Sequence, residues 1–74
     1  MAALSRNDLI ERKETVRAEI AQTRRELARA RQAEAAASEH DRRKHTRRIE
    51  ELEARLEALM ADEHSLRIKI DRAG

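Results

Sequence analysis

Apolar residues recur along this chain in two series, with steps of three, four or seven positions. The first series comprises Leu9, Val16, Ile20, Thr23, Leu27, Ala30 and Ala37. The second comprises Ile49, Leu52, Leu56, Leu59, Leu66 and Ile70, with the polar Glu63 at one position of the same pattern. This spacing is the a/d heptad of helices that pack side by side as a coiled coil. The sequence therefore predicts an all-α fold with two helical segments.

The two series are separated by a stretch that lacks large aliphatic residues and shifts the heptad phase. The first series places its a positions at 20, 27 and 34, and the second places them at 42, 49 and 56. An uninterrupted heptad would have continued at residue 41. A single straight helix of this chain would be about 110 Å long and unpacked in the middle. In a helical hairpin the same stretch is simply the tip.

Two serines carry the sequence signals of helix starts. Ser5 precedes Asp8 by three residues, which is the spacing of a capping box, and Leu4 and Leu9 are spaced as its hydrophobic staple. Ser38 and Asp41 repeat the serine and aspartate of this signal. We therefore expect one helical domain over 1–74, with a helix over 5–36, a tip over 37–40 and a helix over 39–72. The two helices would form an antiparallel coiled-coil hairpin.

The sequence leaves open both the hairpin itself and its register. The segment before Ser38 is rich in Ala and has no Gly, Pro or Asn, so one long continuous coiled-coil helix is the alternative. Folding about residue 36 would join four pairs of opposite charge: Glu19 with Arg55, Glu26 with Arg48, Arg12 with Asp62 and Arg17 with Glu53. Folding about residue 39 or 40 would align the apolar layers better, with Leu27 opposite Leu52 and Ile20 opposite Leu59.

Polar residues also occupy the seam between the two helices, at Lys13, Glu34, Arg42, His45 and Glu63. Polar residues at such positions cost stability but fix register or partner choice. Lys13 and Glu63 are expected to lie near one another in the hairpin and to neutralise each other. A structural role is therefore expected for these residues.

The composition argues against a compact globule, a disulfide-bonded protein and a membrane protein. The chain has no Phe, Trp, Tyr, Pro or Cys, and 43% of its residues are charged. A mean hydropathy of −0.94 is also typical of disorder, but strong helix formers dominate and the only Gly is Gly74. No apolar run approaches the ~20 residues that span a bilayer, and residues 1–4 do not resemble a signal peptide. We expect a cytoplasmic location and no membrane partner.

The residues that often carry catalysis or bind metals are not arranged for either role. His40 and His45 are five positions apart, which does not match the i,i+4 spacing of helical metal ligands, and His64 is remote. The serines and carboxylates match no catalytic triad or phosphate-binding loop. The sequence therefore predicts no enzyme activity, no cofactor and no metal site.

Apolar residues outside the strict heptad gather toward the two chain ends. Ile10, Met60 and Ile68 widen the apolar stripe beyond what one helix contact needs, and two helices alone bury little surface. We therefore expect a homo-oligomer, or a bundle with the helices of another protein. The residues expected at this interface are Leu9, Ile10, Val16, Ile20, Leu56, Leu59, Met60, Leu66, Ile68 and Ile70.

Positive charge is concentrated in the middle of the chain. Residues 22–48 hold nine basic and four acidic side chains, a net charge of +5. In a hairpin this stretch converges on the tip, so we expect Arg42, Arg43, Lys44, Arg47 and Arg48 to contact an anionic partner. The sequence predicts a structural or adaptor protein that works by helix–helix interaction in a larger assembly. The alternative is a small nucleic-acid-binding protein whose tip contacts phosphates, without aromatic stacking on bases.

Overall fold

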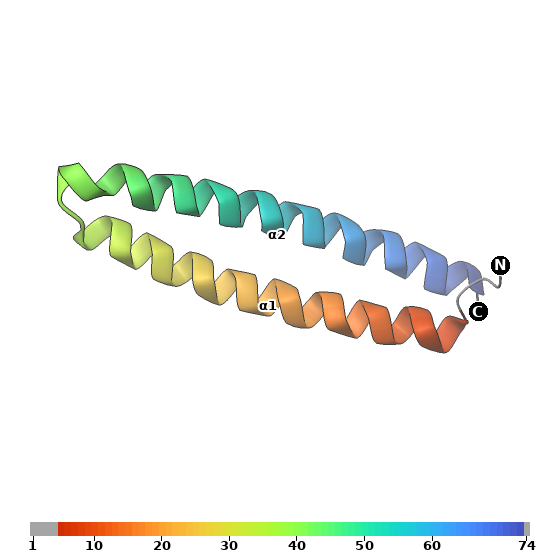
Figure 1. Cartoon of the computed structure of the whole chain (residues 1–74). Helices are drawn as coiled ribbons and strands as arrows, with labels where there is room; N and C mark the ends of the chain where they lie inside the picture. Colours follow the sequence, from red (N-terminus) through yellow and green to blue (C-terminus); the bar gives the residue numbers. More distant parts are fainter. Residues whose placement is uncertain (1–4, 74) are drawn as a thin grey trace.

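The computed structural model describes residues 5–73 and is a helical hairpin (Figure 1). Helix α1 spans Arg6–Ala36 and helix α2 spans Glu39–Ala73, and the two run antiparallel. The longest dimension is 53 Å, which matches the ~52 Å length of α2 at 1.5 Å per residue. The prediction of an all-α hairpin is therefore confirmed, and the continuous rod is wrong.

A capping box starts α1 at the predicted residue. The Ser5 hydroxyl accepts a hydrogen bond from the Asp8 backbone N–H at 3.2 Å, and the Ser5 N–H donates to Asp8 Oδ2 at 3.4 Å. These bonds satisfy backbone groups that a helix end leaves unpaired. The staple expected between Leu4 and Leu9 cannot be assessed, because Leu4 lies outside the described residues.

Replacing Ser5 with Ala is expected to lower the free energy of unfolding by about 1 kcal/mol, because the Asp8 N–H loses its acceptor. Urea unfolding followed by circular dichroism measures this loss. The matched control is Ser65→Ala, at an exposed position inside α2, where alanine is the better helix former. An equal loss of stability in both variants would contradict the capping role.

The tip needs only two residues, Ala37 and Ser38. Ala37 is extended, with φ −77° and ψ 150°, and its N–H donates to the Glu34 carbonyl at 3.2 Å. The Ser38 carbonyl then accepts from the N–H groups of Asp41 and Arg42, which starts α2. The Ser38 hydroxyl donates to Asp41 Oδ2 at 3.4 Å, so the first capping box is only partly repeated.

The seam between the helices is built from the predicted heptad positions. Its longer cluster lies toward the end opposite the tip, and a shorter cluster lies nearer the tip. The longer cluster comprises Leu9, Val16, Ile20, Leu59, Leu66 and Ile70, and the shorter one comprises Leu27, Ile49 and Leu52. The shift in heptad phase does not disturb this packing. Because the turn separates the two helices, each can rotate about its own axis until its apolar face meets the other.

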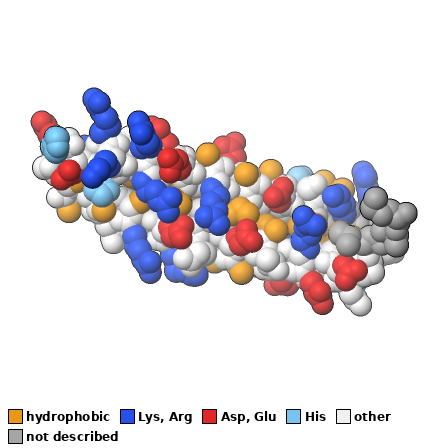
Figure 2. Space-filling model, in the orientation of Figure 1, with side chains coloured by type: hydrophobic (Ala, Val, Ile, Leu, Met, Phe, Trp, Pro, Cys, Tyr) orange, Lys and Arg blue, Asp and Glu red, His pale blue; other side chains and the backbone are white. Residues whose placement is uncertain are grey.

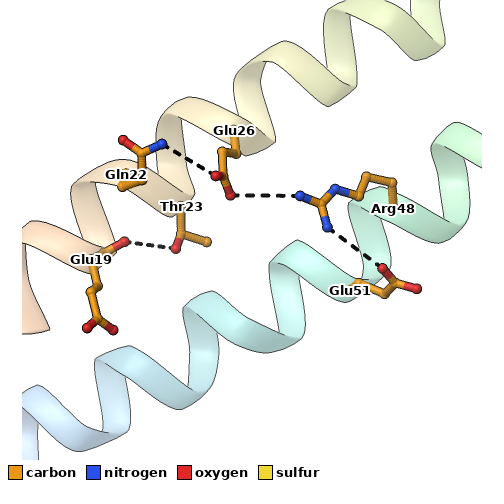
Figure 3. Close-up of polar contacts among 6 residues, drawn as sticks. All are labelled: Glu19, Gln22, Thr23, Glu26, Arg48 and Glu51. Carbon is orange, nitrogen blue, oxygen red and sulfur yellow. Dashed lines mark hydrogen bonds and ion pairs between the residues drawn. The ribbon is translucent and has the colours of Figure 1, made fainter.

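Among the buried residues of the described chain, Thr23 is the only polar one, with 0% of its surface exposed. Its hydroxyl donates to the Glu19 carbonyl at 2.8 Å, one helical turn earlier (Figure 3). This local bond lets a hydroxyl sit in the seam without leaving its donor unsatisfied.

The register agrees with folding about residue 39 or 40, because Thr46 bonds to Glu34 across the seam, and the clusters contain the expected partners Ile20 with Leu59 and Leu27 with Leu52. The same register also brings Arg48 to Glu26 at 3.9 Å, the pair expected from the alternative fold. The alignment of the apolar residues and this ion pair are compatible. Glu26 directly precedes Leu27 and Arg48 directly precedes Ile49, and Leu27 and Ile49 belong to the same apolar cluster.

The other predicted ion pairs are not formed within 4.0 Å among residues 5–73. Glu53 pairs with Arg31 at 3.9 Å instead of with Arg17. Glu63 pairs with Arg67 on its own helix, one turn away, so the expected neutralisation by Lys13 is wrong. Near the tip, the Thr46 hydroxyl donates across the seam to Glu34 Oε2 at 2.7 Å.

Candidate interaction surfaces

Most of the apolar residues expected at a partner interface lie inside the hairpin itself. Six of the ten are buried in the longer cluster, namely Leu9, Val16, Ile20, Leu59, Leu66 and Ile70. Ile10 and Leu56 are partly buried and pack against the same cluster. The heptad residues of this set are therefore covered largely by the other helix of the same hairpin. The two antiparallel heptad faces cover one another from Leu9 and Ile70 as far as Leu27 and Ile49.

Met60 and Ile68 are the large apolar residues that remain exposed in the described chain, at 49% and 39%. They do not form one patch. Met60 directly follows the seam residue Leu59, so it lies on a flank of the hairpin. Ile68 lies midway between Leu66 and Ile70, which places it on the outer face of α2. The wide apolar surface inferred from the sequence is thus divided between two faces.

Basic side chains gather at the first turns of α2 (Figure 2). We call Arg42, Arg43, Lys44 and Arg47 the basic tip. All four are exposed. Arg43, Lys44 and Arg47 line a shallow hollow of about 340 Å³, together with His40 and Asp41. Their spacing of three and four positions puts these three basic side chains on one face of the helix.

Arg48 differs from the basic tip because its charge is already engaged. Its guanidinium lies 3.9 Å from a carboxylate oxygen of Glu26 and 3.9 Å from one of Glu51 (Figure 3). Among residues 5–73, by contrast, no carboxylate oxygen lies within 4.0 Å of a side-chain nitrogen of the four basic-tip residues. Of the five residues expected to meet an anionic partner, the basic-tip four are the better placed.

The polar contact at Glu26 is incomplete. Its Oε1 accepts a hydrogen bond from the Gln22 amide at 3.4 Å, and its Oε2 is inaccessible to solvent and accepts none. The Arg48 guanidinium at 3.9 Å supplies charge compensation without a hydrogen bond. This pair therefore helps to fix the register more than it adds stability.

A groove lies on one flank of the hairpin, far from the basic tip in sequence. It has a volume of about 530 Å³ and is lined by Arg17, Ile20, Ala21, Arg24, Met60, Glu63, His64 and Arg67. We call it the arginine groove. Sequence analysis missed it, because it depends on which flanking residues face each other across the seam. A known register would have revealed it. Arg17 and Arg24 are seven residues apart on α1, and Met60 and Arg67 are seven apart on α2, so each pair lies along one side of its helix.

The described residues contain no group of three or more His, Cys, Asp or Glu side chains placed to hold a metal ion. His64 lines the arginine groove, and His40 lines the hollow at the basic tip. Over 5–73, neither helix has an apolar stretch long enough to cross a bilayer.

Two surfaces of the described residues are candidates for binding a partner: the basic tip, and the flank that carries the arginine groove with exposed Met60. No protein-family model, curated protein or solved structure matches the chain.

Proposed function

We propose that this protein is a non-enzymatic structural or adaptor module, which assembles with other helices and holds an anionic partner at its basic tip. The observation that carries the proposal is the unpaired charge of the basic tip. Four exposed cations lie in the first turns of α2, three of them around one hollow, with no carboxylate oxygen within 4.0 Å of their side-chain nitrogens among the described residues. Such a concentration of charge attracts an oppositely charged surface and orients its approach.

The small number of side chains buried between the two helices supports assembly with further helices. Nine apolar side chains and Thr23 make up the buried residues of the described chain. Domains of this size bury a small share of their surface and gain stability from association. The added helices belong, in this proposal, to a second copy of the chain or to another protein.

The shape of the rod supports an adaptor role. The basic tip lies at one end of a molecule 53 Å long, and the start of α1 and the end of α2 lie at the other (Figure 1). A partner bound at the tip is thus separated from one bound along the flank or at the opposite end. The protein could therefore bind an anionic partner at the tip and a helix elsewhere on the rod at the same time, without a clash between the two partners.

A nucleic-acid-binding function is the second candidate. The same four unpaired cations would suit a phosphate backbone as well as a carboxylate-rich protein surface. The absence of aromatic residues from the sequence limits such binding to phosphate contacts rather than base stacking. Salt dependence separates the candidates, since phosphate binding that releases counterions weakens steeply with ionic strength.

The double variant Arg43→Glu/Arg47→Glu is expected to weaken binding to an anionic probe at least about tenfold. Fluorescence anisotropy with labelled poly-L-glutamate and with a 20-base-pair DNA duplex, each over a salt series, measures the effect. Helicity should be unchanged, because exposed charges contribute little to stability.

The matched control is Arg6→Glu/Arg72→Glu, which makes the same change in net charge at the opposite end of the rod. Equal weakening by both double variants would show that total charge, not the basic tip, governs binding, and would refute the proposed contact. Much tighter binding of the duplex than of poly-L-glutamate, with a steep salt dependence, would favour the nucleic-acid function.

A further inference from the structure

The two flanks of the hairpin carry different charge patterns. On one flank, Glu26 and Arg48 face each other with opposite charges at 3.9 Å. On the other flank, the arginine groove brings Arg17 of α1 together with Arg67 of α2, so that like charges share one hollow. This pair neutralises its own charges within the hairpin. The second flank also holds an opposite-charge pair, Arg31 with Glu53 at 3.9 Å, but at the arginine groove it retains an excess of positive charge that the hairpin does not neutralise.

The charges of the arginine groove are only partly compensated. Arg67 pairs with Glu63, whereas Arg17 and Arg24 have no carboxylate oxygen within 4.0 Å among residues 5–73. The lining contains three arginines and one glutamate, a net charge of +2 before any contribution from His64. Arginines placed beside a helix seam act in coiled coils as selectors of partner charge.

The groove also has an apolar component. Ile20, Ala21 and Met60 are among its lining residues, and Met60 is 49% exposed. Met60 lines a second hollow as well, of about 300 Å³, with Leu27, Arg31, Glu53, Leu56 and Glu57. Because Met60 is common to both, the two hollows adjoin along the same flank. Methionine side chains adapt to the shapes of apolar partners.

The arginine groove and the adjoining hollow are together long enough to hold a helix. From Arg17 to Arg31 the flank of α1 spans 14 residues, or about 21 Å, which is roughly four helical turns. A groove between two packed helices is the place where a third helix packs in a bundle. The small side chain of Ala21 in the groove lining permits a close approach of the added backbone.

We propose that the arginine groove binds an acidic amphipathic helix of another protein, which completes a three-helix bundle. Apolar side chains of that helix would cover Met60 and Leu56, and its carboxylates would meet Arg17 and Arg24. This inference rests on the proposed adaptor function and names the partner chemistry. A second copy is disfavoured as the occupant of the groove, because a two-fold contact centred on it would set one net-positive lining against another.

The test uses a blocked, labelled peptide of three heptads, with Leu at a and d and Glu at e and g, titrated with the full chain by fluorescence anisotropy. Saturable one-to-one binding is expected, and Arg17→Glu/Arg24→Glu should weaken it at least about tenfold. Met60→Ser, which leaves the charge unchanged, should also weaken it. A peptide with Lys in place of every Glu should not bind.

The matched control is Arg29→Glu/Arg72→Glu, an equal charge change at exposed positions that do not line the groove. It should keep the affinity within about threefold, since remote charges are screened. Absence of peptide binding to the folded chain, or equal weakening by the control, would overturn the proposal. Persistent binding with no effect of either Arg17→Glu/Arg24→Glu or Met60→Ser would overturn it as well.

Failure here is distinguishable from failure of the proposed function. Arg43→Glu/Arg47→Glu should leave peptide binding within about threefold, because the basic tip is a separate surface. If the tip variant loses poly-L-glutamate binding while the acidic helix never binds, the groove assignment is wrong and the anionic contact at the tip stands.

Discussion

Leu59→Asp is expected to unfold the hairpin. Leu59 is buried in the longer cluster of the seam, with Val16 and Ile20 of the opposite helix in the same cluster. Removing a buried leucine side chain typically costs about 2–5 kcal/mol, which is comparable with the ~3–5 kcal/mol that the core of so small a domain supplies, and burying an unpaired carboxylate costs more. Circular dichroism should show loss of most of the helical signal at neutral pH and 25 °C.

The neighbouring exposed residue provides the control for this variant. Ala58→Asp places the same charge one position earlier on α2, outside the seam, and is expected to keep a cooperative thermal transition. A helical and cooperatively melting Leu59→Asp protein would mean that the seam between α1 and α2 does not hold the chain together.

Glu63→Leu is expected to stabilise the hairpin by about 2 kcal/mol. Glu63 occupies a heptad position between Leu59 and Leu66, and its side chain is only 16% exposed. Its ion pair with Arg67, which is largely exposed, compensates little of the cost of removing a carboxylate from water. Leucine would extend the apolar cluster instead. The melting temperature should rise by roughly 10 °C, at about 4–8 °C per kcal/mol for a domain of this size.

Glu57→Leu is the control for the stabilised variant. Glu57 is exposed on the same helix, so leucine there should change stability by less than about 0.5 kcal/mol. Urea unfolding of both variants at two protein concentrations separates intramolecular stabilisation from new association. Equal effects of the two substitutions would contradict the assignment of Glu63 to the seam.

The heptad spacing made the helical class and the buried set predictable from sequence. Side chains three and four positions apart share a helix face, so the residues of that face were identifiable before their partners were known. The Ser5 cap was predictable for the same reason, since a capping box joins residues only three positions apart.

The turn at Ala37 and Ser38 was predictable in position but not in detail. The lapse of large aliphatic residues and the phase shift indicated where the seam ends. The bonding of Ser38 was not predictable, because its hydroxyl had two acceptable partners at Asp41, the backbone N–H and the carboxylate. The structure shows the bond to the carboxylate, at 3.4 Å.

Sequence by itself determined two amphipathic helices, their limits to within about two residues, and a basic segment between them. Only the tertiary structure decided the register, the covering of residues such as Leu66 by the other helix of the same chain, and the cross-helix pairing of Arg31 with Glu53. Spacing along one helix is a local property, fixed by the backbone geometry of 3.6 residues per turn. Burial, cross-helix pairing and the grooves beside a seam are properties of two surfaces in contact, so they exist only once both helices have been placed.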